Sequence, residues 1–324
     1  MPGTSTTAAA AETTLQPSRR HRHFWERPAR FSVPYLLIVP VVVVIALVLG
    51  YPLYWLGKLS TEKYGLFELI QHHGTSVGFA NYRSVLHDQI FWHTLVRTVI
   101  FTAVNVGLTM VLGLLIALLL VRVSTVVKLM LSSGLVLVWS MPVVVAVQIF
   151  YWMTNFQNGV VNYVLTQLHV GNFEQHDWYA TPFSQLSLVT VLIVWGAIPF
   201  VAITLFAGLA QVPRDLVEAA EVDGARPWGV FRDITLPVIR PILLILTSLS
   251  IIWDFGVFTQ PYLLIDQSKI TPGNYLMSTY LFEEGYLKAD FGRGAAISIL
   301  MLLIVAALSV LYVRKMVRIG REAV

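Results

Sequence analysis

The chain has 324 residues, of which 56% are hydrophobic and 12% are charged. Because soluble domains carry about 25% charged residues, this composition excludes an ordinary soluble domain and favours a membrane protein. The sequence has no cysteine, which excludes disulfides and thiolate metal sites. The net charge of +4 does not indicate nucleic-acid binding, because the basic residues cluster beside apolar runs, where they orient membrane helices.

The sequence predicts a basic cytoplasmic tail over residues 1–30 and a membrane domain over residues 31–324. The part up to Pro17 is rich in Thr and Ala and has no apolar periodicity, which is typical of a disordered segment. The part from Ser18 to Arg30 contains five arginines and predicts an anchor next to the membrane. A cleaved signal peptide is disfavoured, since the uncharged run that follows is too long and no small-residue cleavage site comes after it.

Six apolar runs are long enough to cross a hydrocarbon core, which needs roughly 20 helical residues. They predict an all-α, polytopic membrane protein with six transmembrane helices. Gly113 and Ala117 in the second run form a small-xxx-small pair, which indicates helix packing. In chain order, the runs are about Val33–Leu56, His93–Val121, Lys128–Met153, Ser187–Ala210, Val238–Ile265 and Gly294–Val313.

The distribution of Lys and Arg predicts the orientation of these helices. Of the 22 such residues, 15 lie in the N-terminal segment, the second-to-third connection, the fourth-to-fifth connection and the C-terminus. The positive-inside rule therefore places both termini in the cytoplasm. On the other side, the connections 58–92 and 153–185 are long. We expect short interfacial helices there, which face an extracytoplasmic binding protein or close the outer mouth, two compatible roles.

A charged stretch, about residues 211–241, separates the fourth and fifth runs and reads VPRDLVEAAEVDGARPWGVFRDITLPVIRP. Asp223-Gly224 is a stop and turn signal after a first short helix. Pro227 suits the first position of a second short helix. We expect that helix to end at Leu236-Pro237, with Pro241 marking re-entry into the bilayer. The prediction is two short helices that meet at an elbow.

This stretch resembles the EAA loop of ATP-binding-cassette importer permeases. The family pattern is Glu-Ala-Ala, Gly four residues later and Ile-x-Leu-Pro about ten residues further. Here it reads Glu218-Ala219-Ala220, Gly224 and Ile234-Thr235-Leu236-Pro237, with no departure. The lead-in FAGLAQVPRDLVEAAEVDGA is similar to the carbohydrate-uptake, maltose-type branch, and the resemblance extends from about Phe31 to the C-terminus. It implies an ABC type I importer permease-like fold in the bacterial cell membrane.

In that family the loop docks into a cleft of an ATPase subunit and transmits its closure; the alternative is an ordinary amphipathic cytoplasmic loop. The resemblance implies these partners: a second homologous permease subunit, two ATP-binding-cassette ATPase subunits and an extracytoplasmic sugar-binding protein. ATP and Mg would be used by the ATPase, and this chain, which has no GxxxxGK[ST] loop, would bind no cofactor. The coupling residues implied are Glu218, Ala219, Ala220, Asp223, Gly224, Ala225, Phe231, Leu236 and Pro237.

Asp254 is the clearest acidic residue inside an apolar run. A carboxylate there costs about 2.5–3.5 kcal/mol on insertion scales, so it is expected to face a cavity or a partner. Its neighbours Trp253, Phe258 and Gln260 add aromatic faces and an amide, which suit a sugar. The resemblance also implies that the helix after the EAA loop helps to bind the sugar. The alternative is a structural ion pair, or a hydrogen bond with the partner permease.

Three more aromatic residues are candidates for the same path. Trp139 precedes Pro142 in the third run, at a family position associated with substrate, and Trp195 and Phe200 flank Pro199 in the fourth. Both prolines free backbone carbonyls, which is tolerable beside a cavity or polar partners. For each Trp, the alternative is packing against lipid or the protein core.

No catalytic or metal site is predicted, since His72-His73 is an isolated external pair and Glu283-Glu284 has no visible acid–base partner. With this absence of a catalytic site, the resemblance implies a non-enzymatic permease subunit of an ATP-driven importer for a di- or oligosaccharide. One rival is a permease of the same machinery for another solute, such as a polyamine. The second rival is a secondary transporter or a membrane enzyme, and the single clear intramembrane acid argues against it.

Overall fold

The computed structural model describes residues 29–265 and 269–322, with side chains described within 37–265 and 269–314. The chain divides into two units, Met1–Tyr54 and Trp55–Val324, and each is described by itself. Of the tail predicted over residues 1–30, residues 1–28 lie outside the described part of the chain.

The first unit contains the start of a long apolar helix. Helix α1 (Ala29–Ile45) continues through a π-helical turn (η1, Ala46–Gly50) into α2 (Tyr51–Ser60), which ends in the second unit. The residues from Leu37 to Leu49 are exposed on all sides of the helix. Such a helix, apolar all round, is typical of a membrane span.

The second unit is almost entirely helical. Its longest helices are α5 (Gln89–Arg122), α9 (Pro182–Leu209), α12 (Leu236–Phe255) and α15 (Phe291–Glu322). Its shorter helices are α3 (Leu66–Gln71), α4 (Ala80–His87), α6 (Thr125–Trp139), α7 (Val143–Met153), α8 (Val160–Gln167), α10 (Arg214–Val222), α11 (Pro227–Val230), α13 (Thr259–Leu264) and α14 (Met277–Phe282). Two π-helical turns, η2 (Phe231–Thr235) and η4 (Glu283–Leu287), and an antiparallel pair of two-residue strands, β1 (Glu62–Lys63) and β2 (Thr75–Ser76), complete it.

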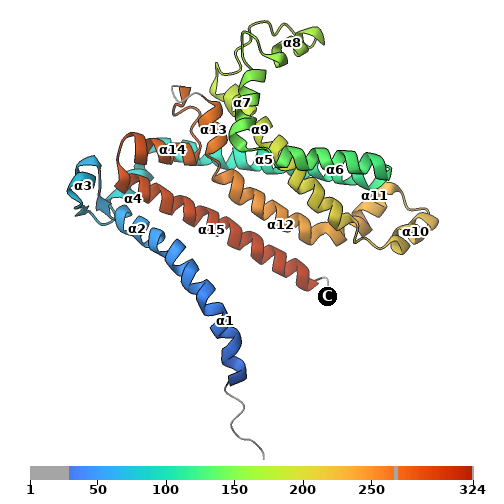
Figure 1. Ribbon diagram of the computed structural model, residues 1–324, viewed down its shortest axis with the longest axis horizontal. Coiled ribbons are helices and arrows are strands. Elements are labelled where there is room, and N and C mark those ends of the chain that lie inside the picture. Colours follow the sequence, from blue (N-terminus) through green and yellow to red (C-terminus); the bar gives the residue numbers. More distant parts are fainter. Residues whose placement is uncertain (1–28, 266–268, 323–324) are drawn as a thin grey trace, which may run out of the picture. The chain divides into compact units, whose positions relative to one another are not determined.

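Helices α5, α9 and α12 pack side by side, and α15 lies along α12 (Figure 1). Ala117 of α5, Val201 of α9 and Ile239 of α12 are fully buried where the first three helices meet. Gly113 faces Val201 so closely that a Cβ at Gly113 would lie 2.6 Å from Val201 Cγ1. The small pair predicted at Gly113 and Ala117 therefore does pack helices together.

Five helices in the described part of the chain are long and apolar enough to cross a membrane. They confirm the first, second, fourth and sixth predicted runs, and they confirm the existence of the fifth. Their bounds are Leu37–Ser60, Gln89–Arg122, Pro182–Leu209, Pro227–Phe255 and Phe291–Arg314.

The third predicted span is wrong as one continuous helix. Helix α6 ends at Trp139, α7 begins at Val143, and the two are bent by 98°. Pro142 has no N–H to continue the helical ladder, and it stands before α7 with ψ 132°, outside helical geometry. The apolar run is therefore a broken span.

The boundaries of the fifth predicted span are also wrong. Helix α12 ends at Phe255, three residues break the helix, and α13 begins at Thr259. Pro261 lies in the first turn of α13, where its missing N–H costs no hydrogen bond. The Val257 carbonyl, freed by the break, accepts a hydrogen bond from Ser278 Oγ.

Glu284 lies in an ion-pair network that the sequence did not reveal. This buried carboxylate accepts a hydrogen bond from Lys288 Nζ at 2.7 Å. Arg293 Nε forms an ion pair with Glu284 Oε2 at 3.2 Å, but the geometry is not that of a hydrogen bond. The Nη2 atom of Arg293 donates a hydrogen bond to Asp88 at 2.5 Å. Burial raises the pKa of Tyr280 to about 12, so its hydroxyl stays protonated and donates to Asp88 at 2.9 Å. The network joins the start of α5 to η4 and α15.

Candidate functional site

The turn at the elbow is a Schellman motif that ends α10. Asp223 caps the helix, and Gly224 has φ +78°, in the left-handed region that favours glycine. The Gly224 N–H donates to Glu221 O at 3.0 Å, and the Ala225 N–H donates to Ala220 O at 2.9 Å. The predicted stop and turn at Asp223-Gly224 is confirmed.

The second half of the elbow differs from the prediction. Pro227 does open α11 at a first helical position, but the helix does not end at Leu236-Pro237, and Pro241 lies inside α12. The chain continues through the π-helical turn η2, in which the Leu236 N–H bonds to Phe231 O, directly into α12. In an α-helix, a proline ring clashes with the carbonyl of the residue four positions earlier. For Pro237, that residue lies inside the wider π-helical turn η2, which explains how the helix continues past the proline. Residues 227–255 are therefore one continuous helix.

The predicted coupling residues lie on the surface of the elbow. Phe231, Ala220 and Leu236 are half-buried. Val222 and Trp228 are 87% and 70% exposed, which is unusual for apolar side chains among charged neighbours. An exposed apolar patch rimmed by polar residues is typical of a protein contact. The exposed coupling residues are Glu218, Ala219, Asp223, Gly224, Ala225 and Pro237.

Three of the predicted substrate residues form one aromatic row. The Trp139 and Phe200 rings stack with centroids 6.1 Å apart and planes inclined by 17°. The Phe200 ring lies 5.7 Å from that of Trp253. The row joins α6, α9 and α12, and its two tryptophans are each more than half exposed. It therefore presents open aromatic faces, which suit the C–H faces of a sugar.

Asp254 follows Trp253 in the last turn of α12. It is only 7% exposed, although the helix breaks two residues later at Gly256. Within the described ranges, none of the ion pairs includes Asp254. A structural ion pair would need a cation from outside these residues.

The other predicted substrate residues lie apart from the row. The centroid of the Trp195 ring lies 5.4 Å from that of the Phe150 ring on α7, and Trp195 packs against a buried apolar cluster. This arrangement favours the core-packing alternative for Trp195. The Phe258 ring stacks on Tyr262 at 4.7 Å. Gln260 is half-buried in the first turn of α13. The structure thus divides the predicted set rather than gathering it around one point.

Sequence reasoning missed an aromatic cluster beyond the helix break. Phe282 of α14 lies 5.1 Å from Phe258, 5.0 Å from Tyr262 and 4.9 Å from Tyr286. The spacing of four residues in each pair, 258 with 262 and 282 with 286, predicts rings on one helix face. It does not predict that the two pairs meet.

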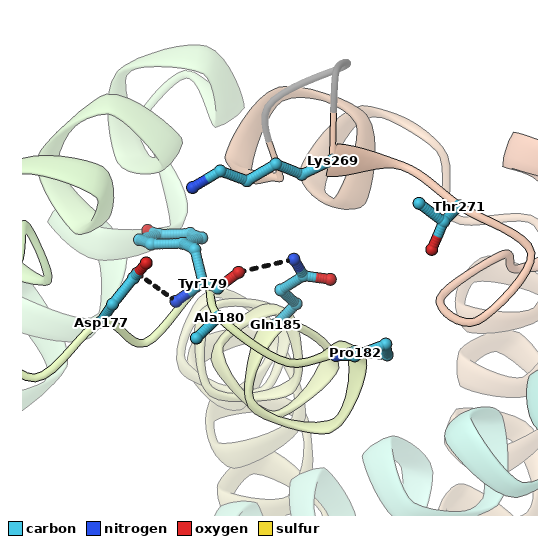
Figure 2. Close-up of a pocket in the computed structure, with 7 residues that line it drawn as sticks. All are labelled: Asp177, Tyr179, Ala180, Pro182, Gln185, Lys269 and Thr271. Atoms are coloured by element: carbon cyan, nitrogen blue, oxygen red, sulfur yellow. Dashed lines mark hydrogen bonds between the residues drawn. The ribbon is translucent and has the colours of Figure 1, made fainter.

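A separate polar hollow of about 340 Å³ lies where α9 begins (Figure 2). Gln185 Nε2 donates to Tyr179 O, and the Tyr179 N–H donates to Asp177 Oδ1, both at 2.8 Å. Lys269 Nζ lies 5.8 Å from the Tyr179 ring centroid, and burial raises the pKa of Tyr179. The lining residues are Asp177, Tyr179, Ala180, Pro182, Gln185, Lys269 and Thr271, none of which belongs to the predicted substrate set.

The sequence profile described as "binding-protein-dependent transport system inner membrane component" matches residues 109–321. The chain belongs to this family. The match begins inside α5 and includes the elbow and the aromatic row. The region described here contains no group of three or more His, Asp or Glu residues that could hold a metal ion.

Members of this family include close relatives of the chain. The chain is 43% identical to the diacetylchitobiose uptake system permease protein DasB of Streptomyces coelicolor over 283 residues. The matched residues make up 87% of this chain and 85% of that protein. The chain is 31% identical to the trehalose/maltose transport system permease protein MalF of Thermococcus litoralis, over 86% of this chain and 92% of that protein. A chain of the bacterial alginate ABC transporter, solved with an alginate pentasaccharide-bound periplasmic protein, matches the fold with a TM-score of 0.74. That chain is 18% identical, and the match covers 89% of this chain and 95% of the other.

Proposed function

We propose that this chain is the permease subunit of an ATP-driven importer for a di- or oligosaccharide. The observation that carries the proposal is the open aromatic row of Trp139, Phe200 and Trp253, at the end of α12 where Asp254 follows Trp253 in the chain. Aromatic faces and a hydrogen-bond acceptor together are the groups that a sugar needs. The sugars in the names of two relatives support the same substrate class.

The partners are a second homologous permease, two ATP-binding-cassette ATPase subunits and an extracytoplasmic sugar-binding protein. The exposed apolar side chains of Val222 and Trp228 support the elbow as the ATPase contact. ATP and Mg act in the ATPase subunit, and this chain binds neither. The bias of Lys and Arg supports an orientation with both termini and the elbow in the cytoplasm.

The continuous helix from Pro227 to Phe255 supports a direct mechanical link between the elbow and the sugar path. Its 29 residues span about 43 Å at 1.5 Å per residue. Trp228 lies in the first turn of this helix and Trp253 in the last. A displacement of the elbow on ATPase closure therefore moves the aromatic row and opens or closes access to it.

The proposal is tested with the complete importer in liposomes, assembled with the binding protein, second permease and ATPase encoded by neighbouring genes. We expect ATP-dependent uptake of a radiolabelled disaccharide such as diacetylchitobiose, maltose or trehalose. Spermidine serves as the comparison solute. Uptake of spermidine alone would replace the sugar assignment, and sugar uptake without the ATPase would reject the ATP-driven mechanism.

A further inference from the structure

Helix α8 turns two of its polar side chains, Asn162 and Thr166, inward, whereas Gln167 at its end is exposed. Asn162 is buried, its Nδ2 donates to His176 O at 3.0 Å, and its Oδ1 accepts from Trp178 Nε1 at 2.6 Å. One turn further, Thr166 Oγ1 accepts the Phe173 N–H at 3.1 Å. These bonds fix α8 to the loop that follows it and determine which side of the helix faces outward.

The outward side of α8 is mostly apolar, with Gln167 as an exposed polar residue at its end. We call the side chains of Val160, Tyr163 and Val164, together with the C-cap residue Leu168, the α8 apolar face; they are between 42% and 67% exposed. A helix on the surface of a water-soluble domain has the opposite arrangement, with its apolar side turned inward. The surroundings of this face are therefore apolar.

The sequence around α8 has no charged residues. Between Lys128 and Glu174 there is no Asp, Glu, Lys or Arg. Exposed aromatic side chains, Trp152 before α8 and Tyr163 on it, are present instead. Trp and Tyr are enriched where a membrane protein meets the boundary between hydrocarbon and water.

The position of α8 in the fold agrees with such a boundary. Helix α7 leaves the line of α6 at 98°, and α8 follows it away from the packed helices α5, α9, α12 and α15 (Figure 1). After α8, the next membrane-length helix, α9, begins at Pro182, and Phe183 in its first turn is 83% exposed. The chain thus passes through α8 just before it enters the bilayer again.

We propose that α8 is an interfacial helix whose apolar face lies in the boundary between headgroups and acyl chains of the non-cytoplasmic leaflet. A binding protein that docks transiently would leave this face in water between docking events, which is unfavourable in proportion to its apolar area. The lipid surface is always present and needs no charge for recognition. This role does not depend on which solute the importer carries.

The test uses the absence of cysteine from this chain. Single-cysteine variants Tyr163→Cys and Leu168→Cys, and the control Glu174→Cys at an exposed charged position of the same protrusion, are labelled with a fluorescent maleimide. The labelled chain is measured in the complete importer in liposomes, with cysteine-free partner subunits. Quenching by lipids with a nitroxide near the headgroup is compared with quenching by aqueous iodide.

We expect the labels at positions 163 and 168 to be quenched by the lipid nitroxide at least twofold more than the label at 174, with the reverse order for iodide. Iodide quenching at 163 equal to that at 174 would overturn the proposal. Protection from both quenchers would also overturn it and would assign the face to the second permease. Protection that appears only after addition of the binding protein would assign the face to that partner.

Discussion

The Trp139 and Phe200 rings stack nearly parallel, with centroids 6.1 Å apart, although they lie on helices separated by a sharp bend and the long connection to α9. Each ring stands close to a proline: Trp139 precedes Pro142, and Phe200 follows Pro199. The bend at Pro142 ends α6 at the tryptophan and leaves its ring 59% exposed beside α9. The open end of the aromatic row is therefore a consequence of the broken third span.

The aromatic row predicts a graded response at Trp253. Replacement with Ala removes one stacking face, and an aromatic contact contributes about 0.5–1.5 kcal/mol beyond its buried area. We expect Trp253→Ala to raise the KM of sugar uptake by up to about tenfold, since 1.4 kcal/mol is one decade. Trp253→Phe retains a ring and should change the KM less. Uptake kinetics in liposomes measure both values.

Trp195 provides a control that separates substrate contact from packing. Its ring packs against Phe150 and a buried cluster, so Trp195→Ala should lower the yield of assembled complex before it changes the KM. An unchanged KM in Trp253→Ala, together with a raised KM in well-assembled Trp195→Ala, would contradict the assignment of the row.

If Asp254 contacts the sugar, its substitution should reduce sugar uptake without reducing assembly of the complex. If the carboxylate accepts bonds from sugar hydroxyls, Asp254→Ala removes charge-assisted hydrogen bonds that contribute about 1.5–3 kcal/mol each. Uptake at low sugar concentration should then fall by roughly tenfold or more, with the complex intact, because an apolar residue is well tolerated in a membrane helix. Complex yield and uptake are measured together on Asp254→Ala and Asp254→Asn.

A structural ion pair with the partner permease predicts the opposite result. Removing Asp254 would then leave a buried cation unpaired, which is strongly destabilising, and the complex would not assemble. Loss of complex in both variants would therefore support the structural alternative, and intact complex with normal uptake would eliminate the substrate role.

A substitution of Gly224 should impair energy coupling without impairing folding. An aspartate there must adopt φ +78° and adds a charge at the tip of the elbow. We expect Gly224→Asp to insert normally and to lose most ATP-dependent uptake. Gly229→Ala is the matched control, since Gly229 is helical, its Cβ position is open, and the change should be silent. Normal uptake by Gly224→Asp with an assembled ATPase would remove the elbow from energy coupling.

The elements that the sequence predicted correctly depend on local signals. Long apolar runs identified four spans, Asp223-Gly224 identified the end of α10, and Pro227 identified the start of α11. Each signal acts within a few residues of the feature it produces, so no knowledge of distant contacts was needed.

The wrong predictions concern features that depend on distant contacts, or on whether a proline ends a helix or lies inside it. Pro142 breaks a span, whereas Pro199 and Pro241 lie inside continuous helices, and hydropathy does not distinguish these cases. The π-helical turn before Pro237 keeps α11 and α12 in one helix, although the Leu-Pro signal favours an end. In the candidate site, residue chemistry and the family resemblance selected the candidates. Only the fold shows that Trp139, Phe200 and Trp253 form one row, and that Trp195 and Phe258 belong to other clusters.

The network around Glu284 could not be predicted from the sequence, because Asp88 and Arg293 are 205 positions apart. It predicts that Arg293 stabilises the packing of η4 and α15 against the start of α5. Arg293→Met leaves Glu284, whose side chain is 7% exposed, with only the exposed Lys288 as a cationic partner, and Asp88 loses a 2.5 Å bond. Breaking a buried pair costs about 3–5 kcal/mol, and the 22% exposure of the Arg293 side chain puts the expected loss at the low end.

Lys288→Met is the matched control for this loss. Lys288 pairs with the same carboxylate at 2.7 Å, but its side chain is 54% exposed, and exposed pairs contribute only about 0.2–1 kcal/mol. The midpoint of heat-induced loss of the assembled complex, followed by size-exclusion chromatography, should fall clearly in Arg293→Met and little in Lys288→Met. Equal midpoints in the two variants would show that the network does not hold η4 and α15 to the start of α5.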